Sequence, residues 1–448
     1  MLGRTRSLLT VAVLGAALVH GGATATAEPV HDPFFRYGGT VPLERYAPGD
    51  VLAVRTVPYH LLNVPTPLTA TQILYRSTDA RGRPSANVTS VLRPPGARSD
   101  RVVSYQSAYD SLNPDDGPSR AIAGNTPLLT ATPTGGTVAI GGTAASGEGA
   151  ALAPFLALGY TVVVADTQGP TADFAAGPEY GMMTLDSLRA AQRVPDSGVT
   201  DSSRIGLYGY SGGAIATNWA SIMAPDYAPD VADNLIGAAQ GGLLVNPANN
   251  LRYAGGSAAW GGVVGMAVVG IGRAYGIDFG PYINDYGREI MARFDDASIL
   301  NVLGQYPGLE WADLVKPEYR DPNTVPEYVD VVNELNMGSA PVPRIPMFVA
   351  QATNGTVEGT RPGPPGTGAG DGIMVAGDVR SLMTTYCDAG LTVQYDEYDT
   401  LSHIPGAALW FPGALGWLLD RFDGKPAPEN CGRIAPGNSL EPQQHAPR

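Results

Sequence analysis

The feature that most constrains the fold of this chain is a glycine-rich turn carrying one serine, within residues 204–216. A short apolar run at 205–208 suits a buried strand, and the apolar residues that follow the turn suit a buried helix. The turn itself, G-Y-S-G-G at 209–213, is a G-x-S-x-G motif centred on Ser211. Where a strand turns sharply into a helix at such a motif, the serine hydroxyl is exposed at the carboxyl edge of the sheet. The pattern favours a nucleophilic serine, and the plainer interpretation is a glycine-rich turn with an ordinary serine.

The beginning of the chain has the pattern of an export signal. Arg4 and Arg6 precede an apolar stretch at residues 8–18, and A-T-A at 25–27 is a small-residue cleavage site. We therefore predict a signal peptide over residues 1–27 and a secreted mature protein. With 28 basic and 42 acidic residues and a net charge of −14, the chain disfavours nucleic acid and anionic membranes as partners.

The chain has two cysteines, Cys387 and Cys431. An even number of cysteines in an exported chain predicts one disulfide, and two free buried thiols are the alternative. The few histidines are dispersed along the sequence and form no cluster with metal-ligand spacing. The sequence therefore predicts neither a metal site nor a cofactor.

The order of apolar runs and turns predicts an α/β core that an inserted helical segment interrupts. Following the signal peptide, we expect a first core part at 28–245, a helical cap or lid at 246–338, a second core part at 339–424 and a tail at 425–448. We expect residues 113–149, rich in Gly, Thr, Pro and Ala, to form a long surface loop. Residues 254–272 carry no charge, but their seven glycines favour closely packed lid backbone over a transmembrane helix.

A serine nucleophile needs a base, and the base needs an acid that orients it. At a strand–turn–helix serine motif of this kind, these partners follow in the order acid, then histidine. His403 is the histidine that follows the last expected strand in a loop before a terminal helix, and so it is the candidate base. Asp371 is the favoured acid because it follows the strand near residue 350 and precedes a helix. Asp378, inside that helix, and Glu358, in the middle of the loop, remain rivals.

The serine also needs donors for the oxyanion that forms when it attacks a carbonyl. The backbone N–H of the residue after the nucleophile, here Gly212, is the usual first donor. A second donor is expected in the loop after an early strand, which places it in residues 107–111, although an ordinary strand end is equally compatible with that position.

Several segments together resemble the secretory lipase family, a lipase-A-like branch of the α/β-hydrolases. They are D-P-F-F at 32–35, Y-Q-S-A-Y-D-S-L at 105–112, G-Y-S-G-G-A at 209–214 and the block from 371 to 403. The resemblance implies a mostly parallel sheet with a helical lid, and Ser211, Asp371 and His403 as the triad. It also implies that the backbone N–H of Asp110 joins that of Gly212 in the oxyanion hole.

The same resemblance implies a secreted lipase or esterase that cleaves acyl esters without a cofactor and touches a lipid interface transiently through its cap. One departure from the family is that residues 352–370 separate the end of a strand from Asp371, with a Gly- and Pro-rich insertion at 354–370. A short-chain carboxylesterase is the nearest alternative. A prolyl-oligopeptidase-type serine peptidase and a lipid-binding protein without catalysis are more distant ones.

Overall fold

The computed structural model describes residues 32–126, 128, 130, 131, 138, 139 and 141–446. The expected signal peptide at 1–27 lies outside these residues. Within them, one large sheet has nine strands in the order β1-β2-β3-β7-β4-β8-β9-β10-β11, and β5 and β6 form a separate pair. The strands are β1 (Val51–Leu61), β2 (Val64–Thr78), β3 (Pro84–Leu92), β4 (Arg101–Gln106), β5 (Thr130–Ala131), β6 (Val138–Ala139), β7 (Thr161–Ala165), β8 (Arg204–Tyr210), β9 (Leu235–Gly241), β10 (Met347–Ala352) and β11 (Val393–Tyr398).

The direction of the strands divides the sheet into two parts. Strands β7, β4, β8, β9, β10 and β11 run parallel to one another, whereas β1, β2 and β3 pair antiparallel at one end. Parallel strands buried on both faces are built from continuous apolar runs, and β7 (T-V-V-V-A) is buried at every position. The prediction of a mostly parallel sheet in an α/β core is confirmed.

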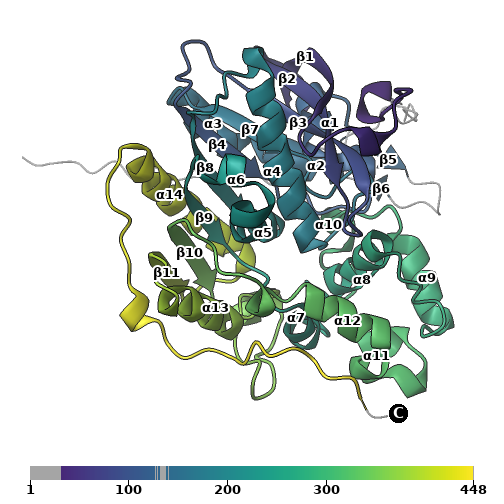
Figure 1. Cartoon of the computed structure of the whole chain (residues 1–448). Coiled ribbons are helices and arrows are strands. Elements are labelled where there is room, and N and C mark those ends of the chain that lie inside the picture. Colours follow the sequence, from purple (N-terminus) through teal and green to yellow (C-terminus); the bar gives the residue numbers. More distant parts are fainter. Residues whose placement is uncertain (1–31, 127, 129, 132–137, 140, 447–448) are drawn as a thin grey trace, which may run out of the picture.

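Helices cover both faces of this sheet (Figure 1). They are α1 (Pro118–Ala123), α2 (Gly141–Gly147), α3 (Gly149–Ala157), α4 (Gly177–Arg193), α5 (Gly212–Tyr227), α6 (Pro229–Ala232), α7 (Pro247–Ala254), α8 (Gly261–Tyr275), α9 (Asp285–Phe294), α10 (Ile299–Val302), α11 (Trp311–Leu314), α12 (Pro326–Glu334), α13 (Ala376–Asp388) and α14 (His403–Phe422). One apolar cluster joins α4, α5 and α13 to the sheet, and a second joins α3 and α14 to it. The central strands β7, β4, β8, β9 and β10 are therefore shielded from water on both sides.

Between β9 and β10 the regular elements are helices, from α7 to α12. They bury an apolar cluster of their own, which includes Trp260, Met266, Phe294 and Val329. Figure 1 shows these helices gathered at one side of the sheet. The uncharged stretch 254–272 contributes most of α8, and no helix in the described ranges is long and apolar enough to cross a bilayer.

For the described residues of 113–149, the prediction of a long surface loop is wrong, and residues 127, 129, 132–137 and 140 lie outside them. Helix α1 lies within this segment and all of its residues are buried. The short strands β5 and β6 and helix α2 also lie within it. The small residues that suggested a loop permit close packing instead. At Gly141 an added Cβ would lie only 1.8 Å from Oδ2 of Asp116, so a larger residue would not fit there.

The two cysteines form a disulfide, as the sequence predicts. Cys387 lies in α13, Cys431 lies in a short 3-10 helix (Cys431–Arg433), and the sulfurs are bonded at 2.10 Å. Beyond Cys431 the tail contacts both α13 and α12. Asn438 donates from Nδ2 to Oδ1 of Asp378 on α13 at 2.7 Å, and the Gln443 N–H donates to Oδ1 of Asn333 on α12 at 2.7 Å. The tail therefore connects the core to the helices between β9 and β10.

Replacing Cys431 with serine should lower the free energy of unfolding by about 4 kcal/mol, because the disulfide closes a loop of roughly 40 residues in the unfolded chain. Urea unfolding of the variant and of the wild type, each with and without reductant, measures this difference. Cys387→Ser should give the same loss, and reductant should destabilise only the wild type. Equal stability of variant and wild type without reductant would contradict the prediction.

Candidate active site

Ser211 lies at a strained turn between β8 and α5. Its backbone has φ 57° and ψ −122°, a conformation that residues other than glycine rarely adopt. The flanking glycines are required by close backbone contacts. A Cβ on Gly209 would lie 2.3 Å from the carbonyl oxygen of Gly213, and one on Gly213 would lie 2.1 Å from that of Gln106. The motif therefore folds as the sequence predicts, with the serine at the carboxyl end of a central parallel strand.

The structure brings Ser211, His403 and Asp371 together. Nε2 of His403 lies 2.8 Å from Oγ of Ser211, and Nδ1 lies 2.7 Å from Oδ2 of Asp371. The backbone N–H of His403 also donates to the carbonyl oxygen of Asp371 at 2.8 Å. Both ring nitrogens thus have a partner, in the arrangement that lets an imidazole accept a proton from a hydroxyl.

The carboxylate of Asp371 is fully buried and held by four donors in total. Oδ1 accepts the backbone N–H groups of Ile373 at 3.0 Å and Met374 at 2.7 Å. Oδ2 accepts Nε2 of Gln351 at 2.8 Å in addition to the ring N–H of His403. Because these bonds saturate the carboxylate, it has one orientation relative to the imidazole.

The insertion does not displace Asp371 from the sheet. The N–H of Gly355 donates to the carbonyl oxygen of Gly370 at 2.7 Å, so the two ends of the segment meet. The loop leaves the end of β10 and returns to the same place, which leaves Asp371 beside the last residues of that strand.

The two rival acids make different contacts. Asp378 accepts both Nδ2 of Asn249 at 3.0–3.1 Å and Nδ2 of Asn438, which ties α13 to α7 and to the tail. Glu358 accepts Nε1 of Trp260 at 2.7 Å and the N–H of Ile404 at 2.9 Å. Nε2 and Nδ1 of His403 are hydrogen-bonded to Ser211 and Asp371, so neither rival takes the position of Asp371.

Electrostatics favours a basic imidazole at His403. Its burial acts to lower the pKa, but the adjacent carboxylate of Asp371, with smaller contributions from Glu358 and Asp110, raises the pKa above the usual value. The ring also packs against aromatic side chains, with Tyr210 at 5.1 Å and Trp260 at 5.1 Å between ring centroids. An imidazolium formed next to Ser211 would therefore be stabilised by charge and shielded from water.

Asp110 lies beside the turn that carries Ser211. Its φ of 33° is positive, and a Cβ on Gly212 would lie 2.0 Å from its Oδ1, so only glycine fits at position 212. Burial raises the pKa of the Asp110 carboxyl to about 7. The carbonyl oxygen of Asp110 accepts the N–H of Ile299 at 2.8 Å, which connects this loop to α10.

Residues that sequence reasoning missed support this loop. Gln168 donates from Nε2 to Oδ1 of Asp110 at 3.0 Å and accepts the N–H of Ser111 with its Oε1 at 3.1 Å. Oε1 of Glu148 accepts the N–H of Ala108 at 2.8 Å, and burial raises the pKa of this carboxyl to about 7. The only sequence signal for Gln168 is its position just after β7, because its partners lie far away in the chain.

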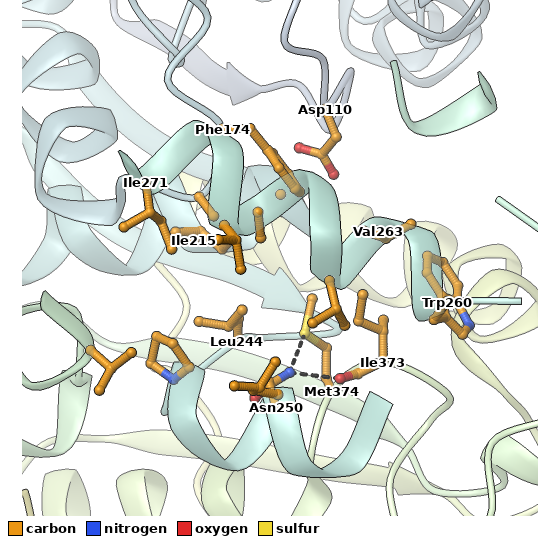
Figure 2. A pocket seen from close by; sticks show the side chains of 18 of the residues that line it. Asp110, Phe174, Ile215, Leu244, Asn250, Trp260, Val263, Ile271, Ile373 and Met374 are labelled. Atoms are coloured by element: carbon orange, nitrogen blue, oxygen red, sulfur yellow. Dashed lines mark hydrogen bonds between the residues drawn. The ribbon is translucent and has the colours of Figure 1, made fainter. Parts of the chain in front are cut away.

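Two cavities meet at the serine. The inner cavity, about 90 Å³, lies among α5, α7, α8 and the segment after Asp371, and its lining is almost wholly apolar. Figure 2 shows side chains of these elements converging on it, with Asp110 at its upper edge. The outer cavity, about 830 Å³, is bounded by α3, α10 and the first turns of α14. Asp110, Ser211, Trp260 and Ile299 line both cavities.

Comparisons with known proteins agree with this architecture. A family model described as secretory lipase matches residues 139–430. Lipase 5 of Candida albicans is 29% identical over 436 residues, which cover 95% of this chain and 88% of that protein. A Mycobacterium tuberculosis protein named as a probable inactive lipase is 28% identical over 426 residues, covering 93% of this chain and 88% of its own length.

Among solved structures, lipase A of Candida antarctica in its closed state superposes with a TM-score of 0.76 at 24% identity, covering 93% of this chain and 91% of that one. This likeness establishes the α/β-hydrolase fold. The matched family segment contains β7, β8, the serine turn, all helices from α7 to α14 and both remaining partners of the serine. The chain therefore belongs to the secretory lipase family and is a lipase or esterase of the α/β-hydrolase fold.

Proposed function

We propose that this protein is a secreted serine carboxylic-ester hydrolase, most simply a triacylglycerol lipase, in which Ser211, His403 and Asp371 form the triad. Oγ of Ser211 attacks the ester carbonyl carbon while Nε2 of His403 takes the hydroxyl proton. Asp371 holds the imidazole through Nδ1. The contiguous hydrogen bonds from Ser211 to His403 and from His403 to Asp371 carry this proposal.

The rest of the reaction follows from the same groups. The backbone N–H groups of Gly212 and Asp110 stabilise the tetrahedral oxyanion. His403 then gives its proton to the departing alkoxide, which leaves as the alcohol and yields an acyl-enzyme on Ser211. Water, deprotonated by His403, attacks the acyl carbonyl carbon. The bond to Oγ of Ser211 then breaks, His403 returns the proton to Oγ, and the carboxylic acid leaves.

The inner cavity is where we place the acyl chain. Its walls are apolar, and each CH₂ group that leaves water for such a cavity contributes about 0.8 kcal/mol to binding. The helices from α7 to α12 then act as the cap and provide the transient contact with a lipid interface. The narrowness of the inner cavity supports a second candidate, a short-chain carboxylesterase that uses the same triad.

Hydrolysis of p-nitrophenyl esters from acetyl to palmitoyl distinguishes the two candidates. For a lipase we expect kcat/KM to rise with acyl length, because each added CH₂ leaves water for the apolar cavities beside Ser211. A profile confined to acetyl and butyryl would reject the lipase and leave the esterase. Fluorophosphonate labels an activated serine, so absence of labelling at Ser211 would reject both and favour a lipid-binding protein without catalysis.

A further inference from the structure

The loop at 354–370 places a carboxylate next to His403. Glu358 ends a 3-10 helix (Gly355–Glu358) and is half-buried. Its Oε1 accepts the backbone N–H of Ile404 at 2.9 Å, and its Oε2 accepts Nε1 of Trp260 at 2.7 Å. The proposed reaction gives this side chain no role. Both of its partners nevertheless lie next to His403, because Ile404 follows it in the chain and Trp260 packs on its ring.

Ile404, the first of these partners, lies in α14, the helix that begins at His403. The N–H of Ile404 is one of the free N–H groups in the first turn of α14, where a negative charge is favourable. Within the described chain, the N-cap Ser402 makes no side-chain hydrogen bond to this turn, and its buried Oγ has no partner. Glu358 therefore supplies the side-chain cap that α14 otherwise lacks.

The second partner forms a wall of the site. The indole of Trp260 is 2% exposed and meets the His403 ring edge to face, with 5.1 Å between ring centroids at an interplanar angle of 81°. Trp260 immediately precedes α8, so it belongs to the helices between β9 and β10, and in Figure 2 it stands at the end of that helix. It lines both cavities beside Ser211.

We propose that Glu358 is a positioning residue that couples the cap to the base, because one carboxylate fixes both the first turn of the helix carrying His403 and the indole packed on its ring. The inference rests on the proposed function of Ser211 and His403. When the carboxylate is present, the imidazole has a fixed wall and Trp260 remains a partition between the two cavities. When it is removed, both the orientation of the ring and the partition are loosened.

The charge of Glu358 adds an effect that packing alone would not give. The charged or titratable groups around His403 are Asp371, Glu358, Asp110 and Tyr210, whose hydroxyl donates to the carbonyl oxygen of His403 at 2.7 Å. The three carboxylates raise the pKa of the imidazole, and catalysis needs its neutral form. Removing the charge of Glu358 should therefore lower that pKa and move the acid limb of the pH–rate profile to lower pH.

The test compares Glu358→Gln, Glu358→Ala and Glu358→Asp with the wild type, using p-nitrophenyl butyrate hydrolysis and the rate of fluorophosphonate labelling. Glutamine keeps the shape but offers one acceptor to two N–H donors, so kcat should fall about tenfold with little change in KM. The acid limb should move down by about half a pH unit in the Gln and Ala variants. Aspartate restores the charge and should return the limb toward the wild-type position.

Glu289→Gln, which removes an exposed carboxylate paired with Arg293, controls for a general change of charge and should leave both readouts unchanged. Wild-type kcat in Glu358→Gln, or an acid limb that stays in place in all three variants, would overturn the proposal. So would a loss of kcat that follows thermal stability alone and is not relieved by aspartate. The Ser211→Ala variant in the same assay separates this result from a failure of the proposed function.

Discussion

Replacing Ser211 with alanine should lower kcat for ester hydrolysis by about 10⁴- to 10⁶-fold. The variant loses the oxygen that attacks the carbonyl, and His403 then has no hydroxyl to deprotonate. What remains is the contribution of the oxyanion donors and of substrate binding, which acts on attack by water. The measurement is the initial rate on p-nitrophenyl butyrate with enough enzyme to detect a residual rate.

The fold should survive this change, because Ser211 keeps its strained backbone through the contacts of β8 and α5 rather than through its side chain. The thermal unfolding midpoint should therefore stay near that of the wild type. Ser202→Ala, at an exposed turn before β8, is the matched control and should keep full activity. Retention of more than a few per cent of wild-type activity in Ser211→Ala would reject Ser211 as the nucleophile.

Replacing Asp371 with asparagine should lower kcat by about 10⁴-fold. The amide has nearly the same shape but presents an NH₂ group, so it can turn a donor toward Nδ1 of His403 and favour the tautomer that protonates Nε2. Such an imidazole cannot accept the proton of Ser211. The expected loss is smaller above pH 9, where hydroxide can deprotonate the serine directly, and a pH–rate profile from 5 to 10 tests both points.

Asp378→Asn is the matched control for the choice of acid. Asp378 is also buried, with a pKa raised to about 6 by burial, and its hydrogen bonds go to Asn249 and Asn438. Its replacement should affect the stability of the contact between α13 and the tail and leave kcat within about twofold of the wild type, since mutations far from the reacting atoms alter structure more than chemistry. A larger loss of kcat in Asp378→Asn than in Asp371→Asn would reverse the assignment.

Most of the fold could be predicted from the sequence, because the strongest patterns that indicate strands and turns are local. Apolar runs such as residues 161–165 and the glycine-rich turn at 209–213 identify strands and the serine turn from neighbouring residues alone. The structure of the segment 113–149 could not be predicted in this way. Its small residues are compatible with a loop or with tightly packed helices, and only the neighbours of Gly141 and of α1 decide between them.

The residues of the candidate site also differ in how far the sequence alone could predict them. The order serine, acid, histidine along the chain follows from the positions of strands, so Ser211 and His403 could be singled out from spacing. Spacing favoured Asp371 as the acid but left Asp378 and Glu358 as rivals, because Glu358 lies within an insertion of unknown path and the other two residues follow it. Only the closure of that insertion between Gly355 and Gly370 places Asp371 beside the imidazole.

The sequence by itself determined the parallel core, the serine turn, the disulfide partners and the candidate residues, because each depends on local pattern or on a count. The tertiary structure decided what distant segments do to one another. It brought Gln168 into hydrogen bonding with Asp110, and Gln351 with Asp371. It also placed Glu358 where its carboxylate accepts hydrogen bonds from Trp260 and from the first turn of α14. Side chains that are close in space but far apart in the chain leave no periodic trace, so hydrogen bonds and cavities of this kind follow only from the folded packing.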